Sequence, residues 1–192
     1  DLWFEQYDVN LFGPIALTQA LLPVIRKANG RIVNIGAVGG GISLPFYGAI
    51  ASSKIAFEAV NDCLRRELYP FGIRVSIIQP SGIATPANHK MRDSVSRFLN
   101  DLEPKGKERY GEAMEAFSQW AFTRHQNSLK PEEVARTVLK ALEARKPKSR
   151  YRLGLDSRAS ALLMKLFPDR WFDKAILGVA RLPIRFGAWL NK

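Results

Sequence analysis

Two short apolar runs on either side of a long helical pattern constrain the fold of this chain more than any other feature. The runs are residues 31–35 in GRIVNIGAV and residues 74–79 in GIRVSIIQP, and glycine or proline bounds each of them. Between them, residues 47–69 have the apolar periodicity of an amphipathic helix, with small residues on one side. A buried strand, a long helix and a second buried strand predict a βαβ unit with parallel strands and a right-handed crossover.

The rest of the chain extends this unit in both directions. Residues 2–25 have helical spacing with a kink expected at Pro14, residues 94–126 are helical and of mixed charge, and another helix runs from Pro131 to about Ala144. SRYRLGL, residues 149–155, predicts a third strand. This order predicts an α/β fold, a partial Rossmann-type, doubly wound parallel sheet that lacks the N-terminal strands. We expect residues 1–155 to form the C-terminal part of such a domain and residues 156–192 to form a basic, apolar helical tail.

Ligands of doubly wound sheets bind outside the carboxyl ends of the strands, which places a site near residues 36–41 and 80–85. The glycine motif GxGxxG, which cradles a pyrophosphate after the first strand of such folds, does not occur in the chain. Gly39, Gly40 and Gly41 follow a strand but precede a loop that contains proline. They therefore match the phosphate-binding motif only weakly.

The positive charge of the chain is concentrated near its C-terminus. The net charge is +11, and residues 144–192 contain twelve Lys or Arg against three Asp or Glu, a net charge of +9. We expect an anionic partner, if the chain has one, to bind there. Aromatic and apolar residues interleave with these cations, which suits a membrane surface, and equally suits a cover over a substrate cleft or a partner subunit. No nucleic-acid binding is expected, because no recognised binding motif occurs.

Cysteine usage and the N-terminal sequence bear on the compartment. The single cysteine, Cys63, cannot form an internal disulfide and is expected to be a buried structural thiol, and no metal site is predicted. The opening DLWFEQYD lacks the basic start of a signal peptide, and glycine and proline break the longest uncharged run, residues 32–53. We expect a cytoplasmic protein without a membrane-spanning helix, attached at most to a membrane surface.

Several motifs in a fixed order resemble a known family. They are the VN of residues 9–10, GRIVNIGAVGG, PFYGAIASSK and RVSIIQPSGIATP, and together they resemble the C-terminal two-thirds of a short-chain dehydrogenase/reductase over about residues 3–155. DCLRRELYPFGIRVSIIQPSG and the segment from SRYRLGL to DRWFD are similar to the branch acting on retinol, steroid and hydroxy-acid alcohols. The resemblance implies an oxidoreductase that moves a hydride between NAD or NADP and the carbon of an apolar alcohol or ketone.

The resemblance also implies a set of catalytic residues, of which this chain keeps only part. Asn10 matches the asparagine that holds a water, and Lys54 matches the lysine that grips the nicotinamide ribose and lowers the pKa of a tyrosine one turn away. The position of that tyrosine is Ile50, and the position of the serine that steadies the substrate oxygen is Ala37. Tyr47, three residues before Ile50, is the alternative acid.

The segment PSGIATP resembles the part of the family that clamps the nicotinamide. The resemblance implies that Pro80, the backbone of Ile83 and the hydroxyl of Thr85 contact the carboxamide. Ser81 stands where the family has glycine, and Gly82 is shifted by one position. The alternative is a plain loop in which Thr85 caps the helix that follows.

These observations lead to one expected function and one alternative of a different class. We expect an oxidoreductase by descent whose site is impaired, because Ala37 and Ile50 have no proton to give. The alternative is a non-catalytic module that binds a membrane through its tail or forms a homodimer through residues 2–25 and 47–69. An uncovered apolar sheet edge also favours a partner. Close approach of the paired helices would depend on the small residues Ala51, Ser52, Ala56 and Ala59.

Overall fold

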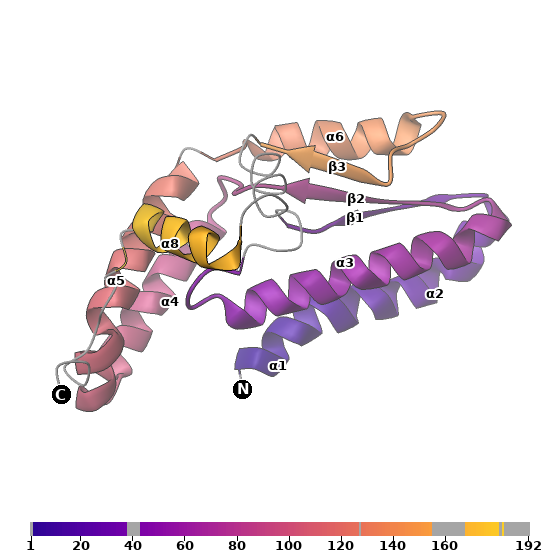
Figure 1. Cartoon of the computed structure of the whole chain (residues 1–192). Coiled ribbons are helices and arrows are strands. Elements are labelled where there is room, and N and C mark those ends of the chain that lie inside the picture. The colour runs from indigo at the N-terminus through magenta and orange to yellow at the C-terminus, as the bar shows by residue number, and fades with distance from the viewer. Residues whose placement is uncertain (1, 38–42, 127, 155–167, 181, 183–192) are drawn as a thin grey trace. The chain divides into compact units, whose positions relative to one another are not determined.

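The computed structural model describes residues 2–37, 43–126, 128–154, 168–180 and 182 (Figure 1). The chain divides into two compact units. Unit 1 is Asp1–Ser81 with Leu129–Leu162, and unit 2 is Gly82–Ser128 with Leu163–Lys192. The domain boundary expected after residue 155 lies outside the described residues and stays a prediction.

A three-stranded parallel sheet forms the centre of unit 1, as the sequence predicts. The strands are β1 (Arg31–Ile35), β2 (Arg74–Pro80) and β3 (Arg150–Leu153), in the spatial order β1-β2-β3. The middle strand, β2, is buried over six of its seven residues, whereas Ile35 on β1 is 45% exposed. This contrast follows from position, since β1 has a neighbour on one side only among the described strands.

Helices cover both faces of this sheet (Figure 1). The helices α2 (Gly13–Lys27) and α3 (Gly48–Leu68) lie on one face, and α6 (Pro131–Glu143) lies on the other. Apolar residues of β1 and β2, together with Ile73 just before β2, pack against α2 and α3 and form a buried cluster. The members of that cluster are Ile32, Leu68, Ile73 and Val75, with Leu22, Ile25 and Leu64 packed around them.

One arginine ties the start of β1 to the end of α6. A guanidinium nitrogen of Arg31, Nη1, donates to the carbonyl oxygens of Ala144 at 2.6 Å and Ala141 at 3.2 Å. The last carbonyls of a helix have no partner within it and carry partial negative charge, so a cation there satisfies both needs. The contact fixes α6 across the sheet from α3.

The N-terminal helix is continuous but changes its winding. It consists of α1 (Leu2–Tyr7), the π-helical segment η1 (Asp8–Phe12) and α2. The sequence predicts a kink at Pro14, and the irregular segment ends two residues before that proline. Proline has no N–H, and its ring clashes with the carbonyl four residues earlier, so regular α-helical hydrogen bonding cannot continue through this point.

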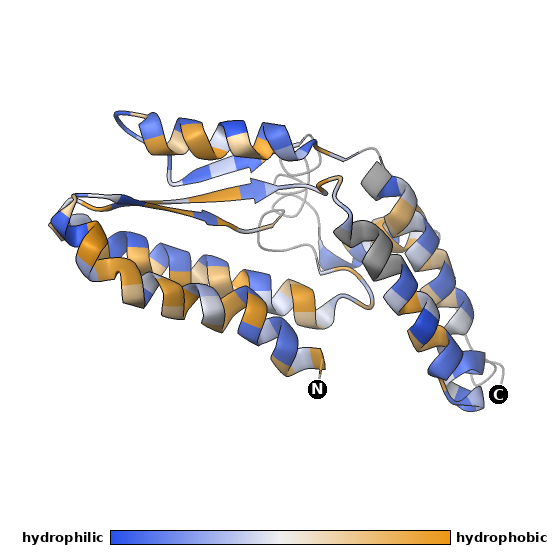
Figure 2. Ribbon diagram, turned by 180° about the vertical axis from the view of Figure 1, so that it is seen from behind, coloured by the Kyte–Doolittle hydropathy of each residue, from blue (hydrophilic) through white to orange (hydrophobic). Residues whose placement is uncertain are grey.

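The outer side of this helix is apolar and exposed. Leu17, Leu21 and Val24 are 61%, 46% and 66% exposed and share one face, and Figure 2 shows hydrophobic residues recurring along the helix. By length and composition alone, Leu2–Lys27 could cross a membrane, whereas the sequence predicts no membrane-spanning helix. The same test is passed by core helices of soluble proteins and by signal sequences, so it is weak support for a span.

The expectation of a buried Cys63 is wrong, because Cys63 is exposed. It shares the outer stripe of α3 with Ile55 and Ala59, which are also exposed. Those positions recur every four residues, as buried positions do, so periodicity alone did not distinguish this stripe from the one facing the sheet.

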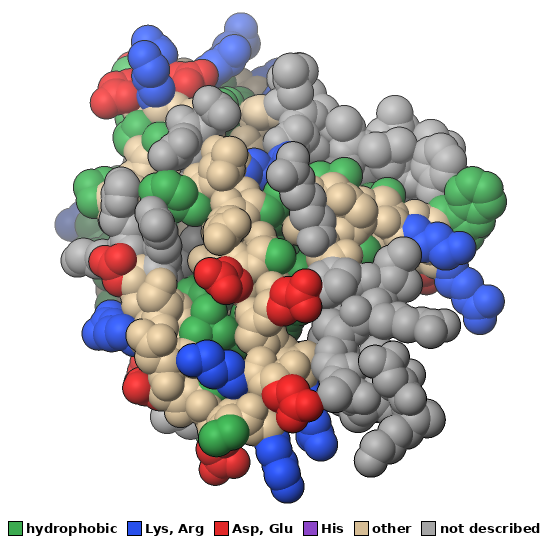
Figure 3. Space-filling view, turned by 90° about the vertical axis from the view of Figure 1, so that its left-hand side faces the viewer, with side chains coloured by type: hydrophobic (Ala, Val, Ile, Leu, Met, Phe, Trp, Pro, Cys, Tyr) green, Lys and Arg blue, Asp and Glu red, His purple; other side chains and the backbone are tan. Residues whose placement is uncertain are grey.

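Unit 2 is helical. It contains α4 (Ala87–Asp101), α5 (Pro104–Gln126) and α8 (Asp169–Val179), and α4 packs against α5. Residues 94–126 were expected to be helical, and the structure adds a break where Leu102 is extended and Pro104 begins a new helix. Between residues 87 and 126 there are seven Lys or Arg and six Asp or Glu, and Figure 3 shows both kinds interspersed on the face it presents. Most of the basic tail lies outside the described residues.

Candidate functional site

Asn10 lies in the π-helical segment η1, where its side chain reaches α3. The amide nitrogen of Asn10, Nδ2, is 3.1 Å from Gln6 Oε1 and 3.2 Å from Ser53 Oγ. Pro14, four residues later, has no N–H to donate to the backbone carbonyl of Asn10. The side chain is therefore held by two partners, and the backbone carbonyl of Asn10 cannot receive the i+4 hydrogen bond of a regular α-helix.

Lys54 and Ile50 lie one turn apart in the first half of α3, so their side chains share a helix face. Both residues are half-buried. Burial lowers the pKa of Lys54, because the charged ammonium loses hydration there. The isoleucine beside it offers neither a donor nor an acceptor, so any polar ligand of this face is bound by Lys54 without help from residue 50.

Ala37 follows β1 and is also half-buried. Just before it, Gly36 donates its N–H to the carbonyl of Ile78 at 2.8 Å, which continues the pairing of β1 with β2. A Cβ on Gly36 would lie 2.9 Å from Ile77 Cδ1, closer than real Cβ atoms come. This packing fixes the backbone that presents Ala37 at the carboxyl end of the sheet. Residues 39–41, the weak phosphate-site candidates, lie outside the described residues.

Pro80 ends β2 and is buried opposite Leu153 of β3. The next residue, Ser81, donates its N–H to the carbonyl of Leu153 at 3.0 Å. Its hydroxyl fills the space where a Cβ on Gly154 would stand, and Gly154 has a φ of +89°, which favours glycine. Ser81 is thus packed against the end of β3, which explains how a serine is accommodated where the family has glycine.

Ile83 and Thr85, the other predicted cofactor contacts, are both half-buried and belong to unit 2. Unit 1 holds Asn10, Ala37, Ile50, Lys54 and Pro80. The first four come from η1, the segment after β1 and the start of α3, and Pro80 from the end of β2. Their roles as catalytic or cofactor-binding residues stay predictions.

Beneath these residues, α3 and the sheet share buried polar contacts. The side-chain amide of Gln79 on β2 donates to the carboxylate of Glu58 at 2.8 Å. Asn34 on β1 donates to the side-chain oxygen of Asn61 at 2.9 Å. Buried polar groups need such partners, and their directionality fixes the rotation of α3 against the carboxyl half of the sheet. The apolar cluster of Ile32 and Val75 lies nearer the amino ends of β1 and β2.

Tyr47 occupies the N-cap position of α3, where its backbone carbonyl accepts the N–H of Ala51 at 2.8 Å and its side chain makes no capping hydrogen bond. Burial raises the pKa of its phenol above the ordinary value. A catalytic tyrosine at neutral pH needs the opposite shift. Within the part of the chain that the structure describes, no group of three or more His, Cys, Asp or Glu could hold a metal ion.

Comparison with known proteins identifies this arrangement of strand ends and helix. The sequence model of the short chain dehydrogenase family matches residues 1–96, which include β1, α3, β2 and all seven of the predicted site positions. The chain belongs to the short-chain dehydrogenase family. The expectation drawn from the motifs is confirmed on this point.

Curated relatives in the family have about a third of their residues in common with this chain. Retinol dehydrogenase 16 of Homo sapiens is 35% identical over 182 residues, which are 93% of this chain and 57% of that protein. The uncharacterized oxidoreductase YbbO of Escherichia coli K12 is 39% identical over 175 residues, 91% of this chain and 58% of that protein. The chain thus spans less than two thirds of the length of these relatives.

Solved structures of the family share the fold. A short chain dehydrogenase from Burkholderia cenocepacia J2315, in complex with NADP, matches 90% of this chain and 59% of its own with a TM-score of 0.63 at 21% identity. A short-chain dehydrogenase from Streptomyces avermitilis matches 90% of this chain and 62% of its own with a TM-score of 0.62 at 24% identity. These likenesses support the partial parallel sheet described above.

The sequence did not predict the buried residues whose hydrogen bonds hold the helices and strands that carry the predicted site residues. Ser53 is fully buried and links Asn10 to α3, and its hydroxyl also donates to the carbonyl of Ile50 at 3.0 Å. Glu58 and Gln79 were not singled out either. The available signal was the spacing of Ser53, Phe57 and Asn61, which marks one inward stripe of α3 on which polar residues alternate with an aromatic.

Proposed function

We propose that the chain derives from an NAD(P)-dependent oxidoreductase of alcohols or ketones and that its catalytic site is impaired. The observation that carries the proposal is the apolar pair at Ala37 and Ile50 beside the half-buried Lys54. Relatives named as retinol dehydrogenases support a bulky apolar alcohol or ketone as the substrate class. The chain belongs to the family, and the proposal concerns only whether the chain catalyses the family's reaction.

The chemistry explains why two small changes matter so much. Reduction of a ketone requires a proton at its oxygen as the cofactor supplies a hydride to its carbon, and a positioned side-chain acid contributes about 10²–10⁴ in rate. A hydrogen bond to the developing oxyanion contributes about 10²–10³ more, although losses of cooperating groups do not simply multiply. Asn10 and Lys54 remain, but by resemblance neither occupies the position of the family's proton donor or of its hydrogen-bond donor to the substrate oxygen.

The residues present fit the nicotinamide part of a cofactor better than its phosphates. Lys54 supplies a cationic donor suited to ribose hydroxyls, and Pro80 ends a buried strand where such ligands bind. The glycine motif for a pyrophosphate is absent from the sequence. We therefore propose that the residues of this chain bind the nicotinamide end of NAD or NADP.

Tyr47 is a poor replacement for the tyrosine that Ile50 displaces. The two residues are three positions apart, which places Tyr47 at the boundary of α3 and seven positions from Lys54. Its phenol has a pKa raised by burial, so it gives up a proton less readily than free tyrosine. In the family, by resemblance, a lysine one turn away lowers that pKa.

The test restores both hydroxyls in the full-length natural protein that contains these residues. Ala37→Ser with Ile50→Tyr should raise the rate of NADPH or NADH oxidation with apolar ketones by about 10²–10⁴. The same double variant carrying Lys54→Met is the matched control, and its rate should fall back toward that of the unaltered protein. Equal rates for the unaltered and restored proteins would contradict the proposal.

A non-catalytic role as a dimerisation module is the second candidate, and one observation favours it. The outward faces of α2 and α3 both leave apolar residues exposed, including Leu17, Leu21 and Val24 on α2 and Ile55 on α3. Of the small residues expected to permit close approach, Ala59 is exposed, and Ala51, Ser52 and Ala56 are half-buried within the chain itself. Contiguous exposed apolar surface of this kind suits association between two copies.

A further inference from the structure

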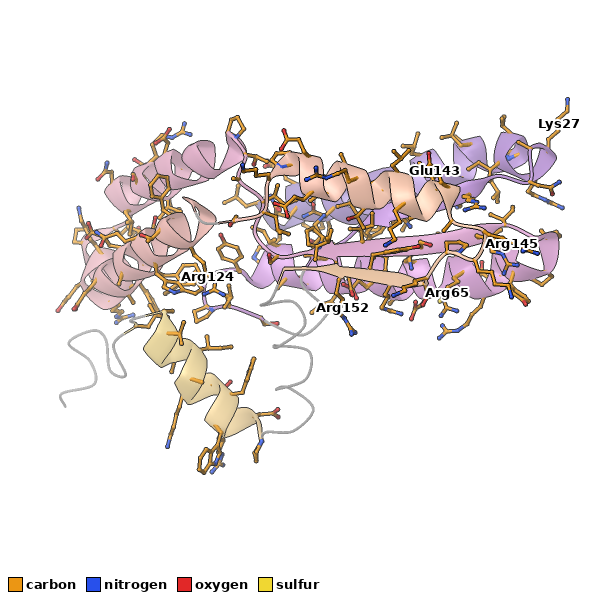
Figure 4. All side chains as sticks on the ribbon, turned by 90° about the horizontal axis from the view of Figure 1, so that it is seen from above. Lys27, Arg65, Arg124, Glu143, Arg145 and Arg152 are labelled. Carbon is orange, nitrogen blue, oxygen red and sulfur yellow. The ribbon has the colours of Figure 1, made fainter. Side chains whose placement is uncertain are left out.

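The end of unit 1 at which all three strands begin carries many cations. β1, β2 and β3 begin at Arg31, Arg74 and Arg150, and α2, α3 and α6 all end on the same side because each runs antiparallel to the strand that follows it. Figure 4 shows Lys27, Arg65 and Arg145 together at this end. Of the exposed cations there, six make up what we call the basic end: Arg26, Lys27, Arg74, Arg145, Lys146 and Lys148.

Side-chain and backbone contacts show that these segments meet. Arg31 binds the carbonyls of Ala141 and Ala144, directly before Arg145, and Arg31 lies in register with Arg74 on the neighbouring strand. The guanidinium of Arg26 lies 4.3 Å from the ring centre of Phe71. That of Arg74 lies 5.3 Å from the ring centre of Tyr69. The ends of α2, β1, β2 and α6 thus form one continuous surface.

Helix ends and internal ion pairs account for other cations here, whereas in the basic end only Arg26 and Lys27 lie in the last turn of a helix, where its dipole favours a cation. Arg31 satisfies the end of α6, and Asp62 binds Arg150 at 2.9 Å and Arg65 at 3.5 Å. Among the described residues, no ion pair joins a member of the basic end to a carboxylate. Glu67 and Glu143 are the exposed acids nearby. Six exposed cations against two acids leave a strong positive surface.

An aromatic turn projects from the same surface. The 3₁₀ turn η3 (Tyr69–Phe71) joins α3 to β2, and its Tyr69 and Phe71 side chains are 65% and 50% exposed. Pro70 stiffens the turn, and Gly72 closes it with a φ of +74°, a conformation that favours glycine. Two exposed rings on a rigid turn among cations have the chemistry of the boundary between lipid headgroups and acyl chains.

We propose that the basic end docks on an anionic lipid surface, with Tyr69 and Phe71 as the part that enters the headgroup layer. A guanidinium covers a face of each ring, so the rings are poor platforms for stacking nucleic-acid bases. A duplex could use the cations but would gain nothing from exposed rings. Docking through the amino ends of the strands leaves their carboxyl ends, with Asn10 and Lys54, on the opposite side of unit 1.

The test is co-sedimentation of the full chain with two kinds of vesicle, phosphatidylcholine alone and phosphatidylcholine containing phosphatidylserine. Binding should require phosphatidylserine and should weaken steeply with salt. Arg74→Glu with Lys146→Glu should lower the partition onto anionic vesicles by about tenfold or more. Lys105→Glu with Lys107→Glu, the same charge change on exposed residues of α5, is the matched control and should have a much smaller effect.

A second variant keeps the charge and removes the rings. Tyr69→Ser with Phe71→Ser should weaken vesicle binding by severalfold at unchanged net charge, with circular dichroism confirming that the variant is folded. Retained binding in both basic-end variants would overturn the proposal and assign any membrane contact to the tail. Equal losses in the α5 control, or tighter binding to duplex DNA than to the anionic vesicles at equal salt, would also overturn it.

Discussion

Lys54 and its neighbours show how a few side chains set the chemistry of the candidate site. Burial lowers the pKa of the Lys54 ammonium, because its charge loses hydration there, and a polar ligand beside it would offset that loss. Neither residue 37 nor residue 50 can supply a hydroxyl to complete a proton path. The site thus retains a group suited to binding and lacks the groups suited to proton transfer, which is the basis of the proposed impairment.

Gln79 gives a prediction at the scale of one residue. Its amide donates to the carboxylate of Glu58, and both side chains are buried. Gln79→Met keeps the volume but removes the donor, and we expect the free energy of unfolding to fall by about 1–3 kcal/mol because a buried carboxylate loses a hydrogen bond. Urea denaturation measures this loss. Gln19→Met, at an exposed position of α2, should change stability by no more than about 0.5 kcal/mol, and an equal loss there would contradict the assignment.

Single residues also mark the limit of what the sequence could predict. Motif spacing placed Asn10, Lys54 and Ile50 on the correct helices, because those residues lie in regular patterns. It did not predict that the Ser53 hydroxyl accepts a hydrogen bond from the side-chain amide of Asn10, since that contact depends on the rotation of α3 against η1. The prediction that Cys63 is buried was wrong for a related reason. A helix with one uncovered face has two stripes of similar composition, one buried and one exposed.

At the scale of elements, strand positions followed from composition and helix details did not. The predicted strand 31–35 is β1, and the predicted strand 74–79 differs from β2 by one residue, because buried strands between glycine and proline have clear ends. The π-helical winding of η1 was not predictable. Pro14 implies a disturbed helix, but whether the disturbance becomes a kink or a π turn depends on packing against α3.

The link between α3 and β3 gives a pH-dependent prediction. Burial alone would raise the pKa of Asp62, but the hydrogen bond and charge of Arg150, with the charges of Arg65 and Arg66, outweigh it and hold that pKa below its usual range. A depressed carboxyl pKa stabilises the fold above the unfolded value of about 3.9, and this stability is lost as pH falls through the folded value. Asp62→Asn should therefore destabilise by about 1 kcal/mol at pH 7 and by progressively less in acid.

Chemical denaturation of both proteins at several pH values measures this difference. Asp101→Asn, at the end of α4, is the matched control at an exposed carboxylate. A difference between wild type and Asp62→Asn that stayed constant down to low pH would contradict the sign assigned to Asp62.

At the scale of the whole molecule, exposed apolar surface is the main unexplained feature. If α2 and α3 pair between two copies, Leu17→Glu with Leu21→Glu should place charges in that interface and shift the protein from dimer to monomer, weakening association by about 10²-fold or more. Light scattering at several concentrations measures the shift. Leu139→Glu with Leu142→Glu on α6, also exposed leucines but on the opposite face of the sheet, is the matched control and should stay dimeric. A monomeric wild-type protein would remove the dimer proposal.

The most direct measurement of the central claim is the rate at which the unaltered full-length protein oxidises reduced nicotinamide with an apolar ketone. We expect a rate at least about 10² below that of Ile50→Tyr, because no side chain at residue 37 or 50 can protonate the product. Tyr47→Phe should then leave the low rate unchanged. A rate equal to that of Ile50→Tyr, abolished by Tyr47→Phe, would contradict the claim and assign the proton to Tyr47.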